Sequence, residues 1–286
     1  MKDKYEVDLK ENIPSFDKIN IAASKSEFDM SSTMSSVKVH GIKQIIGIIA
    51  VAIIFLGIWE ILVRVLNIQN YIFPTPSAII IAFFKAIPTV YTSFFATLFE
   101  LVCGYIIGVT IGLLMAVFLT LVPYFEKIIT PYILLLITTP TLALVPLLML
   151  RMGFTIWPRI IAVALAAGPM VMINSAAGFK RTDLAKIALA KSYGASESQI
   201  FLKIRFPLAA PMIIVGLMVG GIFGLITAVG ADMVGGAFGL GNKLSYYSSL
   251  ARMDYFFAVV LMTTIIGISI WLLLSALANK VTSWQE

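Results

Sequence analysis

The sequence predicts an all-α membrane protein with six transmembrane helices, mainly because of its composition and its long uncharged segments. Of its 286 residues, 59% are hydrophobic and 13% are charged, whereas soluble domains are roughly 45–50% apolar and roughly 25% charged. Mean hydropathy is +0.96. Six windows of 15 to 26 residues lack any charged side chain, and they cover residues 45–59, 101–122, 128–150, 160–179, 206–231 and 255–279. A spanning helix needs roughly 20 mostly apolar residues, so each window can form the centre of one span.

The residues outside these spans are too few for a soluble catalytic domain. Six spans and a polar head leave only ~105 residues for all the connections. There is no GxxxxGK[ST] phosphate-binding loop, so ATP-driven work would require another subunit. Cys103 is the single cysteine and His40 the single histidine, which argues against a disulfide, a histidine metal site or a catalytic triad. We therefore expect no enzyme, and no cofactor or metal bound by this chain.

Residues 1–43 form a polar head that carries seven lysines and seven acidic residues, so its net charge is zero. No apolar run precedes Ile45, and we expect a cytoplasmic tail rather than a secretory signal peptide. Residues 44–286 form the predicted transmembrane domain. With the N-terminus inside, ten basic residues near the spans face the cytoplasm and six face outside. This bias predicts a multi-pass protein of the cytoplasmic membrane with both termini in the cytoplasm.

The first half of the domain contains two predicted spans and one shorter segment. The first span, about 45–66, carries Glu60 and Arg64 in the favourable order for a helical ion pair. Residues 71–88 contain prolines and only a short apolar run, which predicts a short outer helix along the membrane interface. The second span, 94–122, has Gly104, Gly108 and Gly112 at four-residue spacing. Such glycines let another helix backbone approach closely.

The remaining spans differ in their proline and glycine content. The third span, 128–150, contains Pro140 and Pro146, which should kink it. Irregular backbone at that depth is tolerated where it is buried in protein or faces a wet cavity. The fourth span, 160–179, precedes a long cytoplasmic loop, and the fifth, 206–231, is rich in glycine. The sixth span covers residues 255–279.

The loop at residues 180–211 contains the most informative local pattern. Asp183 can cap a first short helix, and Gly194 can end it with a positive φ. Ser196 and Gln199 form a capping box that opens a second helix, which we expect Pro207 to end. Such a helix–glycine–helix hairpin could receive a push from a soluble motor. The alternative interpretation is a basic amphipathic loop that lies on anionic lipid.

This loop resembles the EAA loop of binding-protein-dependent ABC importer permeases, whose pattern is E-A-A-x-x-x-G followed, after nine residues, by I-x-L-P. Two segments, KSYGAS and KIRFPLAAP, carry the resemblance. The departures are Ala188 for the glutamate, Leu189 for the first alanine and Phe206 for the leucine. The resemblance implies an ATPase-coupling loop at 180–207 that includes Ala188, Leu189, Ala190, Gly194, Ser196, Gln199, Ile204 and Pro207.

Further segments in the same order look like the nitrate/sulfonate/taurine-type permease subfamily, and they read WEILVRVLNI, YIFPTPSAI, TPTLALVPLLMLRMG and AVGADMVGGAFGLG. The resemblance implies a MetI-like ABC permease fold and a subunit that translocates a small organic nutrient by alternating access. The implied partners are a second permease subunit in a homodimer, two ABC ATPase subunits that use ATP and magnesium, an extracytoplasmic substrate-binding protein and membrane lipid. Nucleic acid is not among them.

Three polar residues are candidates for the substrate pathway: Glu100 and Asn174 inside spans, and Asp232 at the outer end of one. A charge at the centre of a span is costly, at ≈ 2.5–3.5 kcal/mol. Glu100 could contact a cationic or heteroaromatic substrate, or it could be protonated or paired at a subunit interface. Asp232 could instead order the glycine-rich turn that follows it.

Three other kinds of membrane protein are alternatives to an importer permease. A secondary transporter would normally show an inverted repeat or an ion relay, and neither is evident. An integral-membrane enzyme would need clustered reactive side chains. The coupling subunit of an energy-coupling-factor vitamin importer typically carries two Ala-Arg-Gly-like motifs, and none occurs here.

Overall fold

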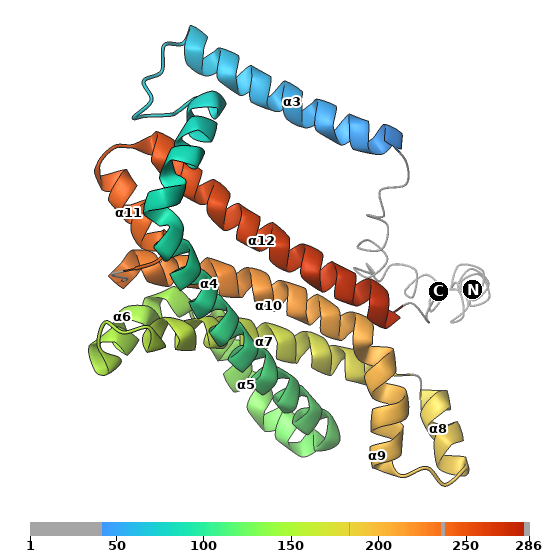
Figure 1. Cartoon of the computed structure of the whole chain (residues 1–286). Coiled ribbons are helices and arrows are strands. Elements are labelled where there is room, and N and C mark those ends of the chain that lie inside the picture. The colour runs from blue at the N-terminus through green and yellow to red at the C-terminus, as the bar shows by residue number, and fades with distance from the viewer. Residues whose placement is uncertain (1–41, 183, 236–237, 283–286) are drawn as a thin grey trace, which may run out of the picture. The chain divides into compact units, whose positions relative to one another are not determined.

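The computed structural model describes residues 42–182, 184–235 and 238–282, and every regular element among them is helical. The chain divides into a short unit, Met1–Gly47, and a main unit, Ile48–Glu286. The helices, labelled as in Figure 1, are α3 (Ile42–Val65), α4 (Pro76–Leu121), α5 (Pro123–Thr138), α6 (Thr141–Met152), α7 (Trp157–Lys180), α8 (Leu184–Ser192), α9 (Glu197–Ile200), a π-helical turn (Phe201–Arg205), α10 (Phe206–Gly235), α11 (Leu240–Ser249) and α12 (Met253–Thr282). Of the predicted tail, residues 1–41 lie outside the described residues.

Within the described ranges, five helices are long and apolar enough to cross a membrane. They are α3, α4, α7, α10 and α12. The number rises to six if α5 and α6, which are bent by 89° relative to each other, are counted as one broken span. The all-helical, multi-span architecture predicted from composition is therefore confirmed.

The predicted division of residues 71–122 into an outer helix and a separate span is wrong, because α4 is one continuous helix of 46 residues. Pro88 lies inside it and removes one backbone hydrogen bond. Packing outweighs this loss: Ala86 and Val90, on either side of the proline, are fully buried in a cluster with Leu240 and Tyr247 of α11. At ~1.5 Å per residue, α4 is ~69 Å long, more than twice the ~30 Å hydrocarbon core.

The centre of the main unit is the crossing of α4 and α7, where two backbones touch. A Cβ atom added at Gly108 would lie 2.7 Å from the carbonyl oxygen of Ala164, and one at Gly112 would lie 2.4 Å from that of Gly168. Gly104 faces Ile160 in the same way, at 2.6 Å. The predicted close-packing role of the three glycines is therefore confirmed, and α10 packs on α7 beside this crossing (Figure 1).

The break between α5 and α6 occurs at Thr139 and Pro140, as the proline pattern predicts. Pro140 has no N–H, and its extended backbone starts α6 rather than continuing α5. Pro146 lies inside α6, which stays helical through it. Among the described glycines, three have a left-handed backbone, and one of them, Gly153, with φ of 76°, ends α6.

The connection from α3 to α4 depends on the predicted ion pair. Arg64 Nε donates to Glu60 Oε1 over 2.7 Å, and Glu60 also accepts from the backbone N–H and the hydroxyl of Ser77, at 3.0 and 2.8 Å. Glu60 therefore fixes the first turn of α4 against the end of α3. This structural role agrees with the i, i+4 spacing.

We predict that Gly112→Ala will destabilise the protein while Gly57→Ala will not. The new methyl at position 112 would overlap a backbone carbonyl, which cannot rotate away, and such overpacking costs about 1–3 kcal/mol. A methyl at position 57 would meet nothing within 4 Å, and alanine is the better helix former. Thermal unfolding of the detergent-solubilised protein, followed by fluorescence-detected gel filtration, measures both. Equal midpoints for the two variants would contradict a backbone contact between α4 and α7.

Candidate functional site

The hairpin of α8 and α9 forms at Gly194, which has a φ of 78°. The N–H of Gly194 donates to the carbonyl of Lys191 at 2.9 Å, and that of Ala195 donates to the carbonyl of Ala190 at 3.0 Å. This pair of hydrogen bonds is a Schellman motif, which satisfies the last carbonyls of α8 and requires a left-handed residue at the glycine position. The predicted glycine turn is confirmed.

The second helix of the hairpin begins with the predicted capping box. Gln199 N–H donates to Ser196 Oγ at 3.3 Å, and Ser196 N–H donates to Gln199 Oε1 at 2.9 Å. Lys191 and Glu197, on opposite sides of the turn, form an ion pair at 2.6 Å. Asp183, the predicted cap of the first helix, lies outside the described residues.

The prediction that Pro207 ends the second helix is wrong. The chain runs from α9 through the π-helical turn into α10 without a break, and Pro207 lies in the first turn of α10. The widened turn, in which Phe206 N–H bonds the carbonyl of Phe201, lies just before the proline, where the backbone must make room for its ring. The hairpin is therefore joined rigidly to α10.

The hairpin has one anchored face and one exposed face. Phe201 is buried against Phe179 at the end of α7, with ring centroids 5.0 Å apart. The exposed face presents large apolar side chains, of which Tyr193 is 84% and Leu202 66% exposed. Among the candidate coupling residues, Ala188, Leu189, Gly194, Ser196 and Gln199 are exposed, and Ala190, Ile204 and Pro207 are partly buried. In Figure 1 this hairpin extends beyond the ends of α7 and α10.

A buried charge cluster joins α4, α7 and α10. Arg159 Nη1 lies 2.8 Å from Glu100 Oε1, and it donates to Asp232 Oδ1 over 2.9 Å and to the carbonyl of Phe238 over 3.1 Å. Thr97 donates to Asp232 Oδ2 over 2.6 Å and accepts from the N–H of Leu240 over 2.7 Å. The cluster thus brings together Glu100 and Asp232, two of the three predicted pathway residues.

The environment of this cluster supports a structural role for both carboxylates. Glu100 and Asp232 are 0% exposed, and neither lines any of the cavities described below. Asp232 also holds the glycine-rich turn, because a Cβ at Gly239, whose φ is 111°, would lie 2.1 Å from its carboxylate. Breaking a buried ion pair by removing one partner is strongly destabilising, at about 3–5 kcal/mol.

Sequence reasoning missed Arg159, which it placed only among the outer basic residues. Arg159 is 4% exposed and is the partner of both acids. The available sequence signal was a basic residue directly before an uncharged window, in a chain that also carries acids within or beside its spans.

Asn174, the third candidate, lies apart from this cluster on α7. Its amide donates to the carbonyl of Met170 at 2.8 Å, and its Cβ faces Gly216 of α10. Because this amide bonds a carbonyl of its own helix and lies at a helix crossing, its role is in packing.

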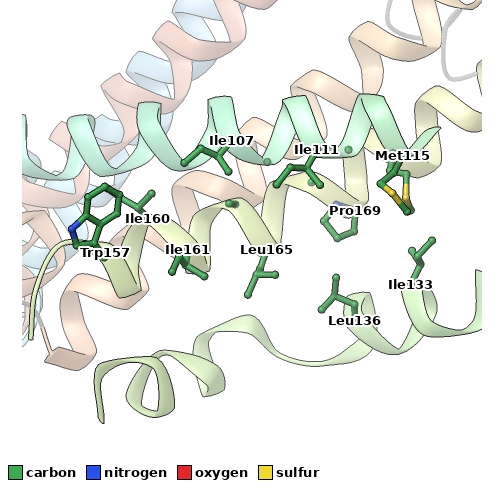
Figure 2. Close-up of a pocket in the computed structure, with 15 residues that line it drawn as sticks. Ile107, Ile111, Met115, Ile133, Leu136, Trp157, Ile160, Ile161, Leu165 and Pro169 are labelled. Atoms are coloured by element: carbon green, nitrogen blue, oxygen red, sulfur yellow. The ribbon is translucent and has the colours of Figure 1, made fainter. Parts of the chain in front are cut away.

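Among the cavities lined by described residues, three lie between the α5–α6 arm and the rest of the bundle. The first encloses ≈ 550 Å³ and is lined by apolar residues of α4, α5 and α7, among them Ile111, Leu136 and Leu165 (Figure 2). The second, ≈ 320 Å³, lies beside the ion pair of Glu126 and Lys180. The third, ≈ 200 Å³, lies at the break between α5 and α6.

Comparison with known proteins identifies what this architecture is similar to. Residues 108–283 match the family model described as "Binding-protein-dependent transport system inner membrane component". A probable ABC transporter permease protein of Haemophilus influenzae is 26% identical over 79% of this chain and 93% of its own. The formylaminopyrimidine transport permease ThiX of Halalkalibacterium halodurans is 25% identical over 80% of this chain and 92% of its own. The taurine transport system permease TauC of Escherichia coli is 28% identical over 66% of this chain and 69% of its own.

Solved structures show the same fold. A chain of the MetNI methionine ABC transporter, in an inward-facing conformation, superposes with a TM-score of 0.62 at 17% identity, covering 69% of this chain and 98% of its own. A chain of an amino acid ABC transporter superposes with a TM-score of 0.56 at 18% identity, and the match covers 68% of this chain and 95% of its own.

We predict that Asp232→Asn will destabilise the protein far more than Glu100→Gln, although both changes replace a buried carboxylate by an amide. Asp232 accepts hydrogen bonds from Arg159 and Thr97, whereas neither oxygen of Glu100 accepts one within the described residues. Removing an acceptor from satisfied buried donors costs about 1–3 kcal/mol. Thermal midpoints and folded yield in detergent compare the two variants. A larger loss for Glu100→Gln would contradict this assignment of the two carboxylates.

Proposed function

We propose how this chain works as a member of the family of binding-protein-dependent transport system inner membrane components, to which it belongs because the family model covers most of its length. It is the transmembrane permease subunit of a binding-protein-dependent ABC importer in the cytoplasmic membrane, a transport protein and not an enzyme. The observation that carries the proposed mechanism is the α8–α9 hairpin, which is continuous with α10.

The exposed face of the hairpin is the docking surface for an ATPase subunit. Tyr193 and Leu202 are large, apolar and exposed, and Lys186 and Lys203 are exposed beside them. Aromatic side chains with a polar rim are typical of interface centres. The capping box, the Schellman motif and the Lys191–Glu197 pair keep this surface rigid before the partner arrives.

A push on the hairpin reaches the membrane through two routes. The first is the uninterrupted path from α9 into α10, and the second is the buried contact of Phe201 with Phe179 of α7. Both helices line the third cavity at the α5–α6 break. ATP binding and hydrolysis by the partner ATPases, with magnesium, would therefore move α7 and α10 relative to the α5–α6 arm.

The functional assembly contains two copies of this chain, two ATPase subunits and an extracytoplasmic binding protein. Support for a second copy comes from α3, whose most hydropathic 18-residue window is 0% buried within the chain. Its described contacts with other helices and loops lie toward its C-terminal end, where Glu60 bonds Ser77 and Trp59 stacks on Phe73 at 5.0 Å. A span free along most of its length can pack against a neighbouring subunit.

The cytoplasmic position of both termini and of the hairpin follows from the distribution of basic residues. The buried Arg159 cluster would then lie toward the outer face. This orientation places the hairpin where a soluble ATPase can reach it.

The transported compound is a small organic solute, as for the relatives named for taurine and formylaminopyrimidine. Nothing in the geometry supports the hypothesis of a cationic substrate held by Glu100, because this carboxylate faces Arg159 and no described cavity. The family match also favours an importer permease over an energy-coupling-factor subunit or a secondary transporter.

We predict that Tyr193→Asp will weaken the binding of the ATPase subunit about 30-fold while Tyr246→Asp will leave it unchanged. A hot-spot aromatic contributes about 2 kcal/mol or more, and a buried carboxylate adds a desolvation cost. Tyr246 is also exposed, and α11, which carries it, lies far from the α8–α9 hairpin (Figure 1). Titration of the ATPase subunit onto permease in nanodiscs, with substrate-stimulated ATP hydrolysis as a second readout, measures the effect. Equal affinity for the two variants would remove the hairpin from the interface.

A further inference from the structure

The third cavity lies deep in the membrane domain, at the bend between α5 and α6. Residues of α5, α6, α7 and α10 line it. Its lining on α7 begins at Leu165, ~12 Å along the helix from Trp157, and Thr227 of α10 lies ~12 Å before Gly235. Because the hydrocarbon core is ~30 Å thick, both distances place the cavity near the middle of the membrane.

The start of α6 presents unused hydrogen-bond donors at this bend. Pro140 provides no side-chain cap, and the N–H groups of Thr141 and Leu142 have no acceptor among the described residues. The N-terminus of a helix also carries a partial charge of roughly +0.5. The 12 residues of α6 are enough to form three turns behind these donors.

An independent observation from α10 points to a ligand at the same place. Thr227 lines the cavity and is 4% exposed, yet its hydroxyl makes no hydrogen bond within the described residues. Other threonines of the spans, such as Thr110, Thr120 and Thr264, donate to a carbonyl in the preceding turn. The side chain of Thr141, also in the lining, likewise has no partner there.

The packing of α6 on α10 holds these groups together. Leu142 occupies the space at Gly230, where an added Cβ would lie 2.5 Å from Leu142 Cδ2. Gly230 is three residues beyond Thr227, so both lie on the same side of α10. The unpaired hydroxyl of Thr227 therefore faces the N-terminal turn of α6.

Taken together, the cavity offers hydrogen-bond donors and a positive dipole but no charged side chain. We propose that it transiently binds the anionic group of the transported solute, a sulfonate, carboxylate or phosphate, through the start of α6 and the hydroxyls of Thr141 and Thr227. This inference rests on the proposed import function and specifies the class of its substrate. Its volume of ≈ 200 Å³ is below the ≈ 300–1,000 Å³ of drug-sized sites, so it fits a small solute or one end group.

A half-helix N-terminus at the membrane midplane is a physical solution to anion recognition in a transporter. A lysine or arginine there would be costly to bury and would hold an anion tightly. The α6 dipole supplies a weaker attraction, which permits release on the other side.

The test measures the local electrostatic potential with two thiol reagents of opposite charge. Thr227→Cys is made in a Cys103→Ser background and assembled with its ATPase subunits in nanodiscs. The reagents are the anionic 2-sulfonatoethyl and the cationic 2-(trimethylammonium)ethyl methanethiosulfonates. The rate at which each reagent labels the cysteine is divided by the rate at which the same reagent reacts with free 2-mercaptoethanol. We expect the anionic reagent to be favoured about tenfold in at least one nucleotide state.

Two further variants connect this preference to α6. Thr141→Asp places a carboxylate at the first position of α6, where it suits the helix but neutralises the dipole, and it should abolish the preference. Thr141→Asn is the matched neutral control and should preserve it. If Thr227→Cys does not assemble, the two reagents are compared at Thr141→Cys instead.

Equal normalised rates, a preference for the cation, or no labelling in any nucleotide state would overturn the proposal. Association with the ATPase subunits is measured on the same samples. Loss of association would count against the coupling hairpin, whereas the ratio of rates judges the anion site alone.

Discussion

The contact between the α4 and α7 backbones determines how the rest of the membrane unit can be arranged. Lipid offers no hydrophobic drive for helices to associate, so they are held by close packing and hydrogen bonds. Gly108 and Gly112 bring α4 against carbonyl oxygens of α7, and Arg159 then reaches both Glu100 and Asp232. The bundle is thus fixed by backbone contact along its length and by one cationic side chain at one end.

The α5–α6 arm lies outside this fixed unit, and that position explains where the cavities are. Each of the three described cavities has α5 or α6 as one wall and α7 as another. The pairing of Glu126 with Lys180 connects the start of α5 to the end of α7, beside the hairpin. If the hairpin couples to an ATPase as proposed, its movement would act first on the walls of α7 and α10, and the 89° bend would let α5 and α6 respond separately.

Local features of the fold were predictable from the sequence, and features decided by distant contacts were not. Gly194, Ser196 and Gln199 form a turn and a cap from neighbours within a few residues, and the structure has both. The continuity of α4 through Pro88 depends on burial against α11, more than 150 residues away, which no local pattern records. Arg159 and Asp232 are 73 residues apart, so their pairing appears only in three dimensions.

Charge placement explains why recognition in the membrane interior would depend on dipoles. A full charge at the midplane costs ≈ 2.5–3.5 kcal/mol, and the described intramembrane groups Glu100 and Asp232 share the single partner Arg159, away from the cavities. This arrangement leaves hydroxyls and free N–H groups as the polar groups that line the bend. Such donors attract an anion without a permanent charge of their own, and the ligand still leaves readily. A transport pathway needs both properties, because a solute bound too tightly at the midplane would block the next cycle.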